Sequence, residues 1–460
     1  SQERRRRAMT AGLDERTLRE IYLTGFEIAV KEGGAKAIMT SYNEVNGVYA
    51  NENKHLLQEI LRDEWGFDGI VISDWGGSND HARGVAAGAN LEMPAPGLDS
   101  ARELIQAIEN GTLTMEELDA CVDDLLDAVL ALSESAKNKK DSFDEKAHHE
   151  LAKRAAAEST VLLKNTDHIL PLQTGAKVAV IGDFAVEPRY QGAGSSMVNP
   201  TRLDSVQLII KDYDLQVVGV SRGYQRTGGE NAAMEKEALD IAAAADVVLY
   251  FFGLDELSES EGLDRTHMRI PQNQIDLLKA IVQVNPNIVG ILSAGSAIEM
   301  PWQYCCKGIL HGYLDGQAGA NAILDILVGK INPSGRLSET YPIRYEDTPA
   351  FRNFPSTERN AEYREGLYVG YRYYGTSKVR FQYPFGFGLS YTNFEYSDLE
   401  VGDEGVSFCI TNTGSCDGAE VAQLYIGLPD AKVFRPEKEL KGFKKIFLKA
   451  GESSRIRISF

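Results

Sequence analysis

The sequence predicts an α/β chain of several domains, in which two modules with mostly parallel sheets precede an antiparallel β-sandwich. First, its 460 residues exceed the roughly 250 to 300 residues at which a single core stops growing. Second, apolar strand-like runs alternate with helical periodicity as far as residue 342, which is the rhythm of parallel sheets. Third, short alternating segments separated by Gly, Pro and Asp begin near residue 391, as is typical of a β-sandwich.

The first module is expected over residues 1–110. Asp14 is a plausible helix N-cap, and apolar residues follow it at helical spacing until Gly33 and Gly34. The expected strands are AKAIMTSYN, DGIVIS and ANLEMP. Only about three strands therefore precede the linker-like AKNKKDSFDE, less than half of the strands that an eight-stranded barrel needs. Residues 111–146 are expected to form a linker.

The second module is expected over residues 147–342. Its strands are the continuously apolar runs KVAVIGD, LQVVGV, ADVVLYFFG and NIVGILSAG, as expected where helices cover both faces of a sheet. Residues 343–390 are expected to be a linker segment, and residues 391–460 a partial β-sandwich that stops in mid-strand at Phe460.

Composition excludes several function classes. The chain is 43% hydrophobic and 25% charged, with a net charge of −19, so nucleic acid and membrane surfaces are poor partners. No apolar run approaches the roughly 20 residues that span a bilayer, and we expect a cytoplasmic protein. Five irregularly spaced cysteines and the absence of an HExxH pattern predict reduced thiols and no metal.

Nucleotide binding is also disfavoured. KVAVIGDFA resembles the opening of a dinucleotide-binding fold, but no GxGxxG follows the strand, and GAGSS at 192–196 comes too late along the chain.

The first candidate for chemistry is Asp74, in the stretch GFDGIVISDWGGSND. Functional groups of parallel α/β folds lie at the carboxyl ends of strands, and Asp74 follows an expected strand. Gly76 and Gly77 let the chain turn sharply there, and the Trp75 indole offers a flat apolar face to a sugar ring. The alternative is that Asp74 is an ordinary turn or N-cap residue.

The second candidate is the acidic stretch FFGLDELSESEGLDRTHMRIP, which contains Glu259 and Glu261 and follows an apolar strand of the second module. It is either a solvated acidic loop or a carrier of one catalytic carboxylic acid. Two carboxyl groups are the minimum for breaking a glycosidic bond, and their separation decides between retention and inversion of configuration. The sequence does not give that separation.

The motifs together resemble those of glycoside hydrolase family 3, and most of all its bacterial β-glucosidases. They are DERTLREIYLTGFEIAVKEG, IMTSYNEVNG, WGFDGIVISDWGG, GANLEMP, STVLLKN, ESEGLDR, NPSGRLSETYP, YVGYRYY and YPFGFGLSYTNFEY. The resemblance implies the last strands of a (β/α)8 barrel, then an α/β sandwich, then a fibronectin type III-like domain. It also implies a retaining, exo-acting hydrolase that removes terminal β-D-glucosyl residues from a small glycoside or oligosaccharide without a cofactor.

The resemblance also implies roles for individual residues. Asp74 matches the family's nucleophile, and Glu261 matches its general acid/base, with Glu259 as a rival because the loop varies in length across the family. The resemblance further places four residues at the sugar: Trp75, Tyr42, Arg6 and Met39. For Tyr42 and Met39, packing in the core is the alternative.

Some of the family's features are not found in this sequence. The family's Lys-His pair, and an aspartate and an arginine that grip the sugar, would fall before Ser1, so we expect a chain truncated at both ends that binds glucose poorly alone. The alternatives are a β-xylosidase or α-arabinofuranosidase, a histidine-dependent phosphorylase or N-acetylglucosaminidase, and an inactive carbohydrate-binding fragment. A homo-oligomer is also compatible with the sequence.

Overall fold

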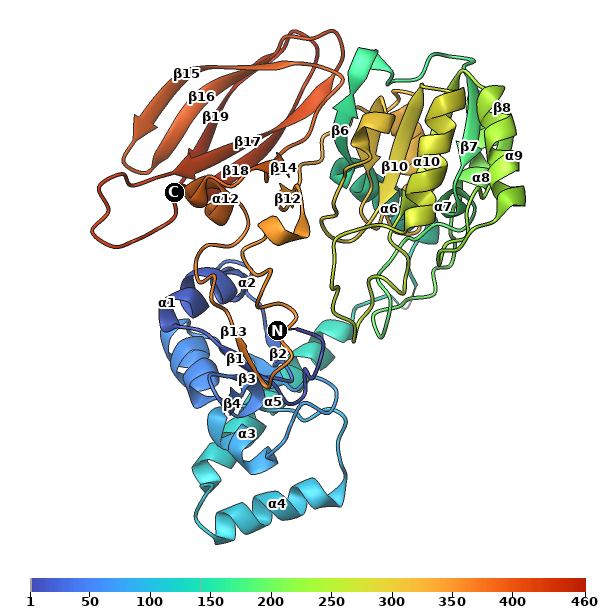
Figure 1. The fold of residues 1–460 in the computed structure, drawn as a ribbon. Coiled ribbons are helices and arrows are strands. Elements are labelled where there is room, and N and C mark those ends of the chain that lie inside the picture. Colours follow the sequence, from blue (N-terminus) through green and yellow to red (C-terminus); the bar gives the residue numbers. More distant parts are fainter. Residues whose placement is uncertain (1, 141) are drawn as a thin grey trace. The chain divides into compact units, whose positions relative to one another are not determined.

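The computed structural model describes residues 2–140 and 142–460, which fold as two units (Figure 1). Unit 1 comprises Ser1–Ser142 and Ala350–Leu367, and unit 2 comprises Phe143–Pro349 and Tyr368–Phe460. Unit 1 therefore contains a segment that the chain supplies only after it has built most of unit 2. No helix among the described residues is long and apolar enough to cross a membrane.

Unit 1 contains two small sheets. The first has the order β13-β1-β3-β4, and its central strand β1 runs parallel to both neighbours. The second pairs β2 with β5 in parallel, and a further parallel bridge joins Ile72 to Leu91. The strands are β1 (Thr10–Gly12), β2 (Ala37–Met39), β3 (Glu44–Val45), β4 (Val48–Tyr49), β5 (Ile70–Ile72) and β13 (Asn360–Glu362). The three expected strands of this module are thus adjacent and parallel, although ANLEMP contributes only the bridge at Leu91.

Helices surround these strands. The Asp14 carboxylate accepts a hydrogen bond from the Thr17 N–H at 2.9 Å and so caps the first helix. The described helices of unit 1 are α1 (Glu15–Thr17), the π-helical η1 (Leu18–Tyr22), α2 (Thr24–Lys31), η2 (Ala50–Glu52), the π-helical η3 (His55–Glu64), α3 (His81–Ala87), α4 (Leu98–Glu109) and α5 (Met115–Ala136). One buried cluster joins α2 and η3 to β5 through Val30, Leu57, Leu61, Phe67 and Val71.

Unit 2 is built on a six-stranded sheet of order β6-β11-β10-β9-β7-β8, in which only β6 is antiparallel to its neighbour. Its strands are β6 (Val161–Asn165), β7 (Lys177–Ile181), β8 (Gln216–Ser221), β9 (Val247–Gly253), β10 (Ile288–Ser293) and β11 (Gly308–His311). The four continuously apolar runs of the sequence correspond to β7, β8, β9 and β10.

Helices cover both faces of this sheet (Figure 1). Tyr250 and Phe252 of β9 point to the face covered by α9 (Ala232–Ala243) and α10 (Gln272–Val284). Leu249 and Phe251 point to the opposite face, against α7 (Asp183–Val186), α8 (Val206–Ile209) and α11 (Gly319–Leu327). The alternation of side chains along one strand therefore fills two cores. The remaining described helices of unit 2 are α6 (Glu145–Ser159), η4 (Thr166–His168), η5 (Ile210–Asp212), η6 (Gln303–Cys305), η7 (Tyr345–Asp347) and α12 (Tyr371–Ser377).

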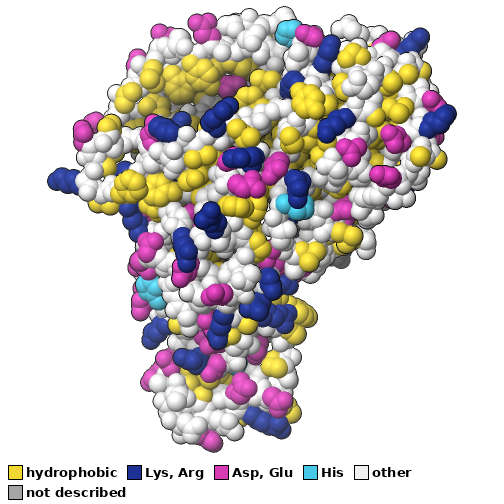
Figure 2. All heavy atoms as spheres, in the orientation of Figure 1, with side chains coloured by type: hydrophobic (Ala, Val, Ile, Leu, Met, Phe, Trp, Pro, Cys, Tyr) yellow, Lys and Arg dark blue, Asp and Glu magenta, His cyan; other side chains and the backbone are white. Residues whose placement is uncertain are grey.

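The C-terminal part of unit 2 is antiparallel. A three-stranded sheet β15-β16-β19 and a two-stranded sheet β17-β18 share a buried cluster around Phe408, Ile410 and Ala422. The strands here are β12 (Tyr341–Pro342), β14 (Phe381–Tyr383), β15 (Phe394–Gly402), β16 (Gly405–Asn412), β17 (Gly418–Ile426), β18 (Glu439–Leu448) and β19 (Ser453–Ser459). Figure 2 shows apolar atoms gathered over these strands, where Tyr396 and Phe443 are among the exposed apolar side chains.

The predicted fold class is confirmed: α/β modules with mostly parallel strands precede the strands of a β-sandwich. Two intervals expected as linkers contain structure. Residues 111–146 include the 22-residue helix α5, which begins with a capping box between Thr114 and Glu117. Residues 343–390 include β13, which pairs with β1 in unit 1.

Candidate active site

Asp74 lies just past the carboxyl end of β5. The parallel pairing of Met39 with Ile72, and of Ile72 with Leu91, brings three strand ends to the same edge. The Ser73 N–H still donates to the Leu91 carbonyl at 2.9 Å, so the pairing ends immediately before Asp74. This is the edge at which parallel α/β folds place their functional groups.

A tight turn fixes the Asp74 carboxylate. The Trp75 N–H donates to Asp74 Oδ1 at 2.5 Å, and the Gly77 N–H donates to the Asp74 carbonyl at 2.8 Å. Gly76 adopts a φ of 75°, a left-handed conformation that favours glycine, and its N–H donates to the Met93 carbonyl at 2.7 Å. The Asp74 side chain is half-buried, so the turn holds it in place while leaving it accessible.

Tyr42 and two arginines lie beside this turn. The Tyr42 hydroxyl donates to the Trp75 carbonyl at 3.0 Å, and burial together with the neighbouring Asp74 carboxylate raises the pKa of Tyr42. The guanidinium groups of Arg6 and Arg7 lie 5.0 and 4.8 Å from the centre of the Tyr42 ring, within the range of cation–π contacts. The structure thus brings together four of the predicted residues of unit 1.

The sequence patterns do not identify Arg7 as a residue of this site. Its Nη2 donates to the Trp75 carbonyl at 3.2 Å, so it contacts the same turn as Tyr42. The run of four arginines from Arg4 to Arg7 was the available signal, but a basic run is more often a solvated surface, and nothing in the run singles out one member.

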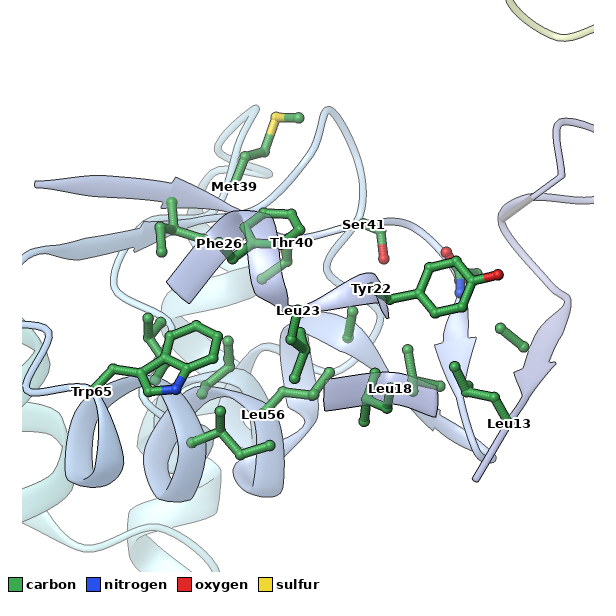
Figure 3. Close-up of a pocket in the computed structure, with 18 of the residues that line it drawn as sticks. Leu13, Leu18, Tyr22, Leu23, Phe26, Met39, Thr40, Ser41, Leu56 and Trp65 are labelled. Atoms are coloured by element: carbon green, nitrogen blue, oxygen red, sulfur yellow. The ribbon is translucent and has the colours of Figure 1, made fainter. Parts of the chain in front are cut away.

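Trp75 and Met39 are exposed, with 61% and 62% of their surface accessible. Met39 belongs to the lining of a cavity of about 290 Å³, but Figure 3 shows its side chain pointing away from the labelled leucines of that lining. The described residues that line this cavity include no charged side chain. This cavity therefore offers neither a carboxylate nor a charged proton donor, whereas the turn at Asp74 does offer a carboxylate.

In unit 2, Glu259 and Glu261 lie in the loop between β9 and α10. Glu259 is held on both of its carboxylate oxygens. Oε2 accepts from Arg189 Nη1 at 2.6 Å and from the Gly295 N–H at 2.8 Å, and Oε1 accepts from the Ser296 hydroxyl at 2.5 Å. Burial alone would raise the pKa of Glu259, but these hydrogen bonds and the Arg189 charge outweigh it and lower the pKa.

Glu261 lies two residues further along and is exposed. The Ser195 N–H donates to Glu261 Oε2 at 2.6 Å, and the Ser195 hydroxyl donates to the same oxygen. The Glu261 N–H donates to the Ala193 carbonyl at 3.0 Å. The segment GAGSS at 192–196, which comes too late for nucleotide binding, therefore supports Glu261.

No group of three or more His, Cys, Asp and Glu side chains in the described part of the chain is arranged to hold a metal ion. The chemistry available at these two places is that of carboxyl groups with hydroxyl and guanidinium neighbours.

Family models match nearly the whole chain. The "Glycosyl hydrolase family 3 N terminal domain" matches residues 5–128, the "Glycosyl hydrolase family 3 C-terminal domain" residues 160–391, and the "Fibronectin type III-like domain" residues 420–460. The first two contain Asp74 and the two loop glutamates respectively.

Curated relatives are similar along the full length of the chain. It is 44% identical to the "Thermostable beta-glucosidase B" of Acetivibrio thermocellus, which it matches over 99% of this chain and 62% of the relative. It is 42% identical to the "Exo-alpha-(1->6)-L-arabinopyranosidase" of Bifidobacterium longum, over 100% of this chain and 62% of the relative. The chain thus spans 62% of the length of these two proteins.

Solved structures agree. The β-glucosidase of Bifidobacterium adolescentis is 43% identical with a TM-score of 0.95, over 100% of this chain and 68% of that one. β-Glucosidase 3B of Thermotoga neapolitana, solved in complex with glucose, is 33% identical with a TM-score of 0.91, over 100% and 70%. Domain models, relatives and folds agree, and the chain belongs to glycoside hydrolase family 3.

Proposed function

We propose that the protein is a retaining exo-β-glucosidase that removes terminal non-reducing β-D-glucosyl residues, with Asp74 as nucleophile and Glu261 as general acid/base. The observation that carries the proposal is the accessible Asp74 carboxylate, held by a tight turn at a strand end beside the Tyr42 hydroxyl. Two of the similar proteins bear the name β-glucosidase at 43 to 44% identity, which supports the sugar.

The contacts of the two loop glutamates favour Glu261 over Glu259 as the acid/base. A general acid must hold a proton near neutral pH until the leaving oxygen takes it. Three hydrogen bonds and the Arg189 charge keep Glu259 ionised, with a lowered pKa. Glu261 is exposed, and the Ser195 N–H and hydroxyl donate to its carboxylate, so substrate can approach it.

The mechanism follows from these assignments. Asp74 attacks the anomeric carbon while Glu261 protonates the leaving oxygen, which gives a glycosyl-Asp74 ester and the free alcohol. Glu261 then removes a proton from water, which attacks the anomeric carbon and releases glucose and the Asp74 carboxylate. Retention requires the two carboxyl groups to come within about 5 to 5.5 Å of each other.

The residues around Asp74 have supporting roles in this proposal. The exposed Trp75 indole packs on the C–H face of the sugar, because an aromatic face is apolar while its edge can still donate a hydrogen bond. Tyr42 keeps its proton because its pKa is raised, so its hydroxyl can donate to the ester or to the substrate. The Arg6 guanidinium lies over the Tyr42 ring, and Met39 contributes exposed apolar surface.

Trapping tests the nucleophile. A 2-deoxy-2-fluoroglucoside slows hydrolysis of the covalent ester, so the label should be recovered on the peptide that contains Asp74. The matched control is Asp74→Asn, which should take up no label, whereas Asp80→Asn, six residues away, should label normally. The assay is run on this chain alone and on a longer chain that spans the full length of its relatives. A label on any other peptide would overturn the assignment.

A pentosidase is the second candidate, because a protein named exo-α-(1→6)-L-arabinopyranosidase is 42% identical over the whole chain. An arabinopyranoside lacks the exocyclic hydroxymethyl group of glucose. Comparing kcat/KM on 4-nitrophenyl β-D-glucopyranoside, β-D-xylopyranoside and α-L-arabinopyranoside separates these substrates. Sugar binding without turnover of any of them would favour a carbohydrate-binding protein instead.

A further inference from the structure

Glu259 is the centre of a desolvated ionic cluster, which we call the Glu259 cluster and define by Glu259, Arg189, Arg265, Gly295 and Ser296. Only 1% of the Arg189 side chain and 13% of the Glu259 side chain are accessible. Arg265 Nη1 lies 3.6 Å from Glu259 Oε1 and donates to the Ser296 hydroxyl at 2.7 Å. Each carboxylate oxygen of Glu259 thus has a donor.

The cluster joins three segments that are distant in sequence. Arg189 follows α7, Gly295 and Ser296 follow β10, and Glu259 lies in the loop after β9. Arg189 also donates to the Leu254 carbonyl at 2.8 Å and to the Glu259 carbonyl at 3.3 Å. The buried Arg189 guanidinium therefore binds the backbone of the loop between β9 and α10 at two places, Leu254 and Glu259.

We propose that Glu259, through Arg189, is a positioning residue that sets the place of the loop carrying Glu261. The inference rests on the proposed function for Glu261 as acid/base. Only one residue, Ser260, separates the two glutamates, and a backbone bridge joins Ser260 to Ala193. Glu259 fixes the buried side of the loop, and the 193–195 segment supports its exposed side.

Glu259 and Arg189 are both largely buried, so each charge depends on the other for compensation. Breaking a buried pair by removing one partner leaves an uncompensated charge, which is far more costly than removing both partners. Arg265, Glu339, His311 and Tyr341 also interact electrostatically with Glu259. Burial raises the pKa of Glu339 to about 7, so at neutral pH Glu339 does not supply a full second charge to replace Glu259.

The first measurement is hydrogen exchange of the backbone amides of residues 254–265 in the full chain. Glu259→Gln keeps the side-chain shape and removes the charge, and we expect exchange of the loop to accelerate about tenfold or more as local opening becomes easier. Arg189→Lys keeps the charge with fewer donors and should give an intermediate rate. The matched control is Glu256→Gln in the same loop, whose ion pair with Arg226 is partly exposed and whose loop exchange should equal that of the wild type.

The second measurement separates positioning from simple loss of structure. For Glu259→Gln, kcat/KM on cellobiose, whose leaving group needs a proton, should fall about 100-fold. The leaving group of 2,4-dinitrophenyl β-D-glucoside needs no proton, so kcat/KM of Glu259→Gln on this substrate should fall by less than about threefold. Unfolding midpoints of the variants identify any that fail to fold, in which case Arg189→Lys carries the test.

The two proposals fail differently. If loop exchange in Glu259→Gln and Arg189→Lys equals that in Glu256→Gln, the positioning role is wrong whatever the activity. If Glu259→Gln forms glycosyl azide when azide is added and Glu261→Ala does not, Glu259 is itself the acid/base and both assignments are overturned. If the wild type hydrolyses no glycoside, the function fails while the exchange result still decides the role of Glu259.

Discussion

Replacing Gly194 by alanine should impair Glu261 although no acidic residue is substituted. Gly194 adopts a φ of 110°, and a Cβ built there would lie 2.7 Å from Glu261 Oε2 and closer still to Glu261 Cβ. Ordinary contacts begin at 3.4 Å, so Glu261 must retreat by about 1 Å, a displacement that can cost about 100-fold in rate. The backbone strain adds a cost of about 1 to 3 kcal/mol in stability.

The assay is kcat/KM on cellobiose together with the urea midpoint of unfolding. Gly192→Ala is the matched control, because φ at Gly192 is not in the left-handed region and its Cβ would meet only Ser196 Oγ at 3.6 Å. We expect the control to keep the wild-type values of both quantities. If Gly194→Ala and Gly192→Ala give the same kcat/KM and the same midpoint, the close approach of Gly194 to Glu261 has no functional consequence.

Three further predictions concern Glu261, His311 and Leu324. Glu261→Ala should lose at least about 100-fold in kcat/KM on cellobiose, and azide should restore turnover of dinitrophenyl glucoside as glycosyl azide; the absence of azide product would contradict the acid/base role. Burial lowers the pKa of His311 to about 4, so the unfolded chain binds the proton first, and stability should fall by about 3 kcal/mol as pH drops from 6.5 to 4. His311→Asn should flatten this dependence in urea unfolding, and an unchanged slope would contradict it. Leu324→Ala, at a fully buried position, should cost about 2 to 5 kcal/mol, and a urea midpoint equal to the wild type would refute that packing role.

Sequence patterns predicted the strands and turns that depend on residues close together in the chain. The continuously apolar run KVAVIGD became β7 because helices cover both faces of its sheet. Asp74 follows β5 as expected, because an apolar run ending at Ser73 and two glycines define a strand end and a turn. The capping box of α5 was visible as Thr114 and Glu117, but an acidic, lysine-rich stretch after the helix favoured a linker.

Contacts between distant segments could not be predicted. Arg189 and Glu259 are 70 residues apart, and nothing near either residue marks the other as its partner. The sequence alone therefore does not decide whether Glu259 or Glu261 is the general acid/base, because both are glutamates of one acidic loop. In the structure the two glutamates have different neighbours: a buried guanidinium contacts Glu259, and Ser195 contacts Glu261.

The strand β13 gives the chain an unusual order of assembly. Residues 360–362 align beside Thr10–Gly12 in parallel register, so the sheet of unit 1 lacks one of its strands until the ribosome has translated some 350 residues beyond β1. During synthesis, the sheet of unit 1 is incomplete and one side of β1 is unpaired, while much of unit 2 emerges and can fold first. A chaperone that shields this exposed strand, or a pause in translation, would thus act on Thr10–Gly12 long after these residues have left the ribosome.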